Sequence, residues 1–128
     1  MVILFSSSGK SLYVLKSAEY AIKEGAVTVG VTNHADSPLG TMCTIPLVTI
    51  ATGVSKSFPT KTTTSALAIL YQLAYEMGRN NKVLSENNYK KLSEELVEQV
   101  PNMIRKVYET ELEKIKKTSQ MFLDARSY

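Results

Sequence analysis

The chain has 128 residues, which is the length of a single domain. Its composition, 44% hydrophobic and 21% charged, excludes a disordered chain, a collagen-like repeat and a disulfide-rich mini-protein. A net charge of +3 indicates neither a nucleic-acid-binding nor a membrane-binding surface. The single cysteine, Cys43, excludes an internal disulfide and a cysteine-based zinc site, and it favours a reducing, cytoplasmic compartment.

Residues 1–78 alternate short apolar runs with helical patterns. We expect strands over residues 2–5, 27–32 and 46–50, with a helix that Gly25 ends between the first two. Apolar runs without polar alternation predict strands that are buried on both faces, as in parallel sheets. The order strand, helix, strand therefore predicts an α/β fold: a three-layer parallel sheet with flanking helices.

The remaining helices follow from apolar spacing and from capping residues. Asp36 or Ser37 is expected to cap a short helix that reaches Met42. A helix over residues 60–77 is apolar nearly all round, which predicts burial against the sheet or against a partner in a homodimer.

Residues 79–128 carry no strand pattern and are expected to form a second part, a two-helix linker. Ser85 is the expected cap of the first helix, and Pro101 is expected to break it and to lie in the first turn of the next. The apolar stripe of that last helix consists of Ile104, Val107, Tyr108, Leu112, Ile115 and Phe122. The charges on the opposite faces are interpreted as solvated surface.

The candidate chemistry lies in one loop, Ser6-Ser7-Ser8-Gly9-Lys10-Ser11, between a predicted strand and a predicted helix. Ligands of open α/β sheets bind beyond the carboxyl ends of the strands, where this loop is expected. Free N–H groups at a helix start, together with serine hydroxyls, would form a small anion site. The alternative is a serine-rich turn that only caps the helix.

The identity of the anion leaves two interpretations. Gly9-Lys10-Ser11 after a strand matches the end of the P-loop pattern G-x-x-x-x-G-K-[ST], but that pattern requires glycine where this chain has Leu4. The later predicted strands also end without a carboxylate that could hold magnesium. Nucleotide binding is therefore disfavoured, and saturable binding of Mg-ATP would restore it.

The second interpretation is a family resemblance. The serine loop, Thr32-Asn33, the turn Asp36-Ser37-Pro38-Leu39 and the segment from Pro59 to Thr64 resemble the sugar isomerase (SIS) domain. The chain looks like the first SIS domain of the tandem group that contains the glucosamine-6-phosphate synthase isomerase and the fructosamine-6-phosphate deglycases. The resemblance implies a flavodoxin-like sheet, a hexose or amino-hexose phosphate as ligand, and no cofactor or metal.

Carried over by residue, the resemblance implies that Ser6, Ser7, Ser8 and Ser11 hold the phosphate. It implies that Thr60 and Lys61 lie near the sugar, although Lys61 also fits a surface lysine at a helix start. Lys10 stands where the synthase group has glutamate, Pro59 replaces a serine, and Gly53-Val54-Ser55-Lys56 replaces a Gly-x-Glu sequence. These departures leave the sugar open.

The resemblance also bears on the ends of the chain and on catalysis. The family's first strand is missing, and residues 125–128 fall about where a second SIS domain would begin, so a segment of a longer protein is expected. The catalytic glutamate, histidine and lysine are expected in that second domain, with His34 as an exposed loop histidine and Cys43 as a buried small residue. The function would be that of an isomerase, an aminotransferase-like synthase or a deglycase, and the alternative is a non-catalytic sugar-phosphate sensor.

Overall fold

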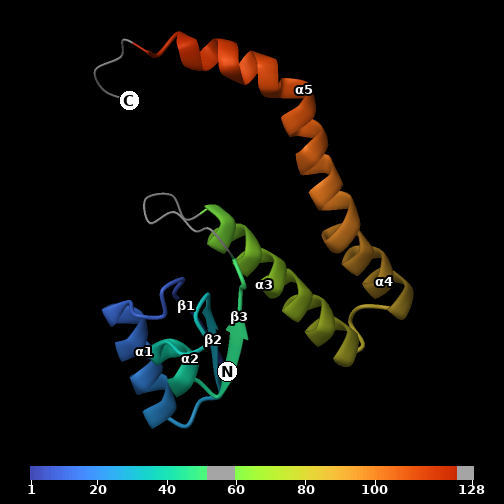
Figure 1. The fold of residues 1–128 in the computed structure, drawn as a ribbon. Helices are drawn as coiled ribbons and strands as arrows, with labels where there is room; N and C mark the ends of the chain where they lie inside the picture. Colours follow the sequence, from blue (N-terminus) through green and yellow to red (C-terminus); the bar gives the residue numbers. More distant parts are fainter. Residues whose placement is uncertain (52–59, 124–128) are drawn as a thin grey trace. The chain divides into compact units, whose positions relative to one another are not determined.

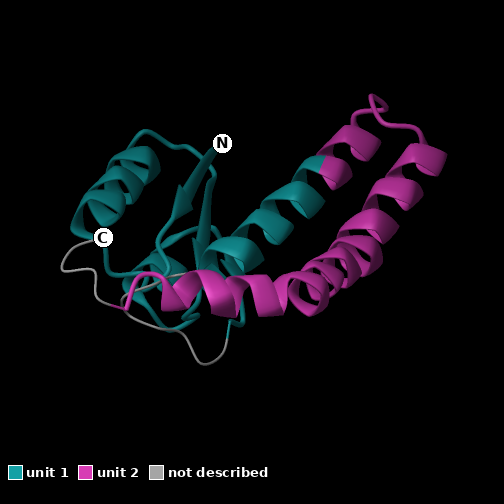
Figure 2. Ribbon diagram, turned by 90° about the horizontal axis from the view of Figure 1, so that it is seen from above, with its two compact units in different colours: residues 1–74 teal, residues 75–128 magenta. Residues whose placement is uncertain are grey.

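A computed structural model describes residues 1–51 and 60–123 of the chain (Figure 1). The predictions that concern residues 53–56, Pro59 and residues 125–128 lie outside these described residues. The chain divides into two compact units, Met1–Ala74 and Tyr75–Tyr128 (Figure 2). The elements in chain order are β1 (Val2–Phe5), α1 (Leu12–Lys23), β2 (Thr28–Thr32), α2 (Pro38–Met42), β3 (Ile45–Val48), α3 (Thr60–Asn80), α4 (Glu86–Glu94), a π-helical segment (Glu95–Gln99) and α5 (Val100–Gln120).

The first unit is built on a parallel sheet with the strand order β1-β2-β3. Gly30 of β2 stands opposite Leu4 of β1 and Pro46 of β3. Helices flank this sheet on both faces: α1 and α2 lie on one side and α3 on the other (Figure 1). The predicted three-layer α/β fold with a parallel sheet is confirmed.

The core of this unit forms two clusters, one on each face of the sheet. Leu4, Ala18, Leu39 and the predicted buried Cys43 form the cluster under α1 and α2. Val29 and Val31 of β2 and Ala66 of α3 form the cluster on the other face. Each face of the central strand therefore has its own helical cover.

The prediction that every strand is covered on both faces is wrong for the outer strands. All five residues of β2 are buried, but Ile3 and Phe5 of β1 keep 43% and 42% of their surface exposed. Ala66 of α3 packs against Val29 and Val31 of β2, with Leu47 of β3 at the margin of the cluster. The face of β1 that carries Ile3 and Phe5 is therefore not covered by α3, which lies over β2.

Helix α3 begins at Thr60, as expected, and continues to Asn80 rather than ending at residue 77. The predicted burial against the sheet is found on one face of this helix, where Ala66 packs against β2. Only Thr62 and Ala66 are buried, whereas Leu67 is 50% exposed and Tyr71 is 53% exposed. A helix that lies on a sheet contacts it with one face, so the apolar residues on its other faces stay at the surface.

The second unit is helical. Ser85 caps α4, as predicted, because its hydroxyl accepts a hydrogen bond from the N–H of Asn88 at 3.3 Å. Arg79 forms an ion pair with Glu76 at 2.8 Å, and its guanidinium lies 4.4 Å from the ring centre of Tyr89. The Tyr89 hydroxyl in turn donates to Glu76. These contacts join the end of α3 to α4.

Pro101 does not break the helical path as predicted. It lies in the first turn of α5, as expected, but α4 continues into α5 through the π-helical residues Glu95–Gln99. No residue of α4, the π-helical segment or α5 is buried. Among the described helices, none is both long and apolar enough to cross a membrane.

Candidate functional site

Three loops meet at the carboxyl edge of the sheet. Residues 6–11 follow β1, residues 33–37 follow β2, and residues 49–51 follow β3. Because the strands are parallel and paired in register, their carboxyl ends lie at the same edge. The predicted serine loop is therefore part of a composite surface.

The serine loop packs closely on the loop after β2 at Gly9. A Cβ atom on Gly9 would stand 1.9 Å from the Ser37 hydroxyl oxygen and 2.9 Å from that of Thr32. Gly9 has a φ of +64°, in the left-handed region that favours glycine. Its carbonyl accepts a hydrogen bond from the N–H of Leu39 at 3.1 Å, so the loop is also tied to the start of α2.

Backbone hydrogen bonds fix the base of the serine loop. The N–H of Ser6 donates to the carbonyl of Val31 at 3.0 Å, which continues the pairing of β1 and β2 beyond the strands. The Ser7 carbonyl accepts from the N–H of Asn33 at 3.0 Å and from the Thr32 hydroxyl at 3.4 Å. These bonds place the serine loop on β2 and its following loop.

Asn33 links the loop after β2 to the loop after β3. Its side-chain oxygen accepts from the Thr49 hydroxyl at 2.8 Å and from the N–H of Ala51 at 2.6 Å, and its amide nitrogen donates to the Ala51 carbonyl at 2.9 Å. Sequence reasoning noted Asn33 only as part of a motif and missed this role. The available signal was an asparagine directly after a buried strand, where its side chain can replace backbone partners.

The serine hydroxyls do not cap α1. Ser11 occupies the N-cap position, but its side chain makes no capping hydrogen bond. The hydroxyl of buried Ser6 accepts from the N–H of Ser11 at 3.4 Å, and that of exposed Ser8 accepts from the N–H of Lys10 at 3.3 Å. The alternative of a turn that only caps the helix therefore does not describe this loop. The N–H groups of the first turn of α1 receive no capping oxygen from Ser11.

Ser7 carries a hydroxyl without a partner. Its oxygen is buried, and among the described residues it has no hydrogen-bond partner. Leaving a buried polar atom unsatisfied costs about 1–3 kcal/mol. A ligand oxygen could satisfy this hydroxyl if it entered the loop.

The other predicted site residues lie at the start of α3. Thr60 and Lys61 are exposed residues of its first turn, and the preceding residues 52–59 are outside the described part. Whether they lie near a sugar stays a prediction.

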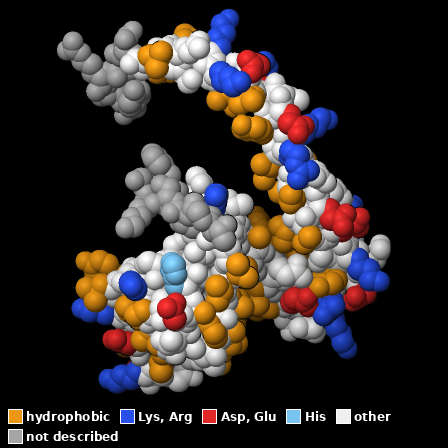
Figure 3. Space-filling model, in the orientation of Figure 1, with side chains coloured by type: hydrophobic (Ala, Val, Ile, Leu, Met, Phe, Trp, Pro, Cys, Tyr) orange, Lys and Arg blue, Asp and Glu red, His pale blue; other side chains and the backbone are white. Residues whose placement is uncertain are grey.

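A hollow of about 200 Å³ adjoins the serine loop. It is lined by Ser8 and Lys10 of that loop and by His34, Asp36 and Ser37 of the loop after β2. Figure 3 shows the chain's one histidine at the surface, near acidic and basic side chains. Within residues 1–51 and 60–123, neither Lys10 nor Asp36 takes part in an ion pair, so both charges face solvent or a ligand.

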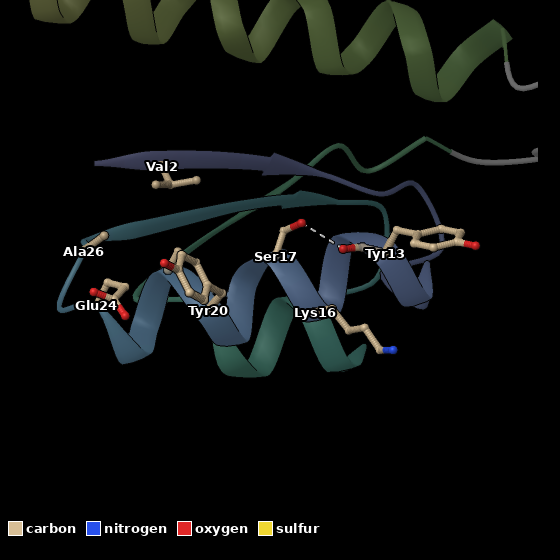
Figure 4. A pocket seen from close by; sticks show the side chains of 8 residues that line it. Val2, Tyr13, Lys16, Ser17, Tyr20, Glu24 and Ala26 are labelled. Atoms are coloured by element: carbon tan, nitrogen blue, oxygen red, sulfur yellow. Dashed lines mark hydrogen bonds between the residues drawn. The ribbon is translucent and has the colours of Figure 1, made fainter.

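A larger hollow of about 580 Å³ lies along α1, away from these loops. Figure 4 shows Tyr13, Lys16, Ser17, Tyr20 and Glu24 along the helix, with Val2 and Ala26 near them. Its surface is almost wholly apolar, and none of the loop serines lines it. We therefore place the candidate site at the smaller, polar hollow. The described residues contain no group of three His, Cys, Asp or Glu side chains that could hold a metal ion.

An open parallel sheet with polar loops at the carboxyl ends of its strands is typical of α/β domains that bind ligands at that edge. A family model described as the SIS domain matches residues 1–75, so the chain belongs to the SIS domain family, which binds phosphosugars. A solved structure described as the crystal structure of a hypothetical protein is similar in fold, with a TM-score of 0.54 at 24% identity over 70% of this chain. This chain covers 52% of that chain, about half its length. No curated protein matches.

Proposed function

We propose that this chain binds the phosphate group of a hexose or amino-hexose phosphate. The groups that would hold it are the hydroxyls of the serine loop, Ser6, Ser7, Ser8 and Ser11, and the N–H groups of the first turn of α1. The observation that carries the proposal is the uncapped start of α1 beside four serines, in a domain of a phosphosugar-binding family.

The charges around this helix start support an anion. A helix N-terminus carries a partial positive charge, and α1 has no acidic residue in its first turn to compensate it. Lys10 adds a full positive charge within the loop itself. The partnerless hydroxyl of Ser7 would gain an acceptor in a phosphate oxygen.

The sugar would extend from the phosphate towards the surface of the site. The hollow beside the loop offers Asp36 and His34 for hydrogen bonds to sugar hydroxyls, and Thr60 and Lys61 are further proposed contacts. We assign residues 1–78 to this binding part and residues 79–128 to a helical linker.

The proposed biological role is that of the phosphate-binding part of a phosphosugar isomerase, an aminotransferase-like synthase or a fructosamine-6-phosphate deglycase. Membership of the SIS family supports the ligand class, and the resemblance to the tandem group supports the type of reaction. The groups that carry out the chemistry are not assigned to residues of this chain.

Calorimetric titration of the chain with fructose 6-phosphate and with glucosamine 6-phosphate tests the proposal. Unphosphorylated fructose and Mg-ATP are the comparison ligands. We expect binding of the phosphorylated sugars only. Ser8→Ala and Ser11→Ala should each weaken it about 5- to 30-fold, because each removes a hydrogen bond to a charged group worth about 1–2 kcal/mol.

Ser17→Ala is the matched control, since Ser17 lies in α1 but its hydroxyl donates to the Tyr13 carbonyl within the helix. We expect it to bind like the unaltered chain. Binding of Mg-ATP without binding of either sugar phosphate would contradict the proposal and favour a nucleotide site.

A further inference from the structure

Most of the apolar stripe of α5 is exposed, and Leu112 within it is half-buried. Ile104, Val107, Tyr108 and Ile115 keep 58%, 59%, 60% and 53% of their surface accessible. Their spacing of three, four and seven residues places them on one side of the helix. Figure 3 shows hydrophobic side chains gathered along one side of this helix. From Ile104 to Ile115 these side chains extend over roughly 16 Å of the helix.

Residues 75–123, the described part of its own unit, leave this stripe uncovered. No residue of α4, the π-helical segment or α5 is buried, so these helices share no closed core. Soluble proteins rarely leave a continuous apolar surface of this kind exposed, and such surfaces mark sites of association.

The charges beside the stripe indicate what kind of helix would fit it. Residues 94–98 hold three glutamates and no basic residue, whereas residues 114–117 hold three lysines and no acidic residue. The centres of the two clusters are separated by roughly 30 Å of helix. Lys114 and Lys116 pair with Glu111 and Glu113 on the helix surface, but exposed pairs of this kind contribute little.

A second copy of this helix, packed antiparallel, is complementary both to the apolar stripe and to the two charged clusters. It brings the glutamate cluster of each copy to the lysine cluster of the other, whereas a parallel copy brings like charges together. The apolar stripes then face each other, because the midpoint between the clusters falls between Ile104 and Tyr108. A two-fold symmetric contact of this type closes at two copies.

We propose that the chain forms a homodimer in which α5 packs antiparallel against α5 of a second copy. Ile104 then lies beside the partner's Tyr108, and Val97 lies beside the partner's Ile115. This interface is independent of the proposed phosphate site, and it differs from the helix over residues 60–77 that the sequence suggested as an interface.

Sedimentation velocity of the full chain over a range of concentrations tests the dimer. We expect a reversible dimer whose dissociation constant rises at least tenfold in Ile104→Lys, which places a charge in the stripe. Asn102→Lys is the matched control: it adds the same charge on the side of α5 away from the stripe, and should leave the dimer intact. Because Ile104 is exposed, circular dichroism should show unchanged helix content in both variants.

Cross-linking tests the direction of the helices in a Cys43→Ala background. Val97→Cys and Ile115→Cys proteins should form a disulfide with each other when mixed, and neither should form one with itself. Self-cross-linking of Val97→Cys alone would contradict the antiparallel contact. A monomer at all concentrations, or a dimer that Ile104→Lys leaves unchanged, would overturn the proposal, and neither result would affect the sugar-phosphate titration.

Discussion

Gly9 is the residue on which the arrangement of the candidate site depends most directly. It combines a φ of +64° with a contact so close that a Cβ atom would overlap the Ser37 side chain. Glycine is the residue that meets both requirements. The serine loop can therefore rest on the loop after β2 without displacing it.

Gly9→Ala should lower the free energy of unfolding by more than Gly25→Ala. Gly25 has a similar φ of +73°, but a Cβ atom there would meet nothing within 4 Å. Gly25→Ala thus reports the backbone strain alone, about 1–2 kcal/mol, and Gly9→Ala should exceed it by at least ~1 kcal/mol. Urea unfolding of both variants checks this, and equal losses would show that the contact with Ser37 is unimportant.

At the scale of residues, the sequence allowed the serine loop to be found but not its neighbours. Polar residues between a buried strand and a helix are visible in the sequence. So were the two candidates for the cap of α2, of which Ser37 is the one whose hydroxyl accepts from the N–H of Gly40 at 3.2 Å. The bonds from Asn33 to Thr49 and Ala51 join residues that are 16 and 18 positions apart. These hydrogen bonds depend on the position of the end of β3 in space, and local sequence patterns carry no information about that position.

At the scale of elements, Pro101 accounts for the π-helical segment that precedes α5. Proline has no N–H to donate to the carbonyl of Val97, four residues earlier, and its ring crowds that carbonyl. The helix passes this point by widening over Glu95–Gln99 instead of ending. The rule that proline ends a helix therefore does not hold here, because the helical path continues past Pro101 after one π-helical turn.

Pro101→Ala should stabilise the helical unit, since alanine restores the missing hydrogen bond. We expect thermal unfolding followed by circular dichroism at 222 nm to show a gain of about 1–3 kcal/mol. Pro38→Ala is the control, because Pro38 begins α2 and costs nothing at a true helix start. A comparable gain from both variants would mean that Pro101 does not interrupt the helix.

The positions of strands and helices followed well from the sequence, but their exposure did not. Apolar runs located β1 and α3 closely, because buried strands and helices need apolar side chains. They could not show that Ile3, Phe5, Leu67 and Tyr71 reach the surface, since exposure depends on the width of the sheet and on what covers it.

At the scale of the whole molecule, the two units differ in how they are held together. The first has two buried clusters around β2, whereas no residue of α4 or α5 is buried. Buried apolar contacts are what protect backbone hydrogen bonds from opening. Local stability should therefore differ strongly between the units.

Hydrogen exchange should reveal this difference. We expect the amides of Val29 and Val31 to exchange slowly, and the amides of α5 to exchange at least a hundredfold faster in the Ile104→Lys variant. Mass spectrometry of peptides from the two regions measures both rates. Equal protection of β2 and α5 in that variant would show that another surface covers α5.

The links among the three loops at the carboxyl edge have a consequence for the energetics of recognition. Gly9, Ser7 and Asn33 join these loops by backbone and side-chain bonds that exist without a ligand. The conformational entropy of these segments is therefore lost when the domain folds, rather than when a ligand arrives. A bound molecule keeps more of its gross interaction energy as affinity, because the cavity it enters is preorganised.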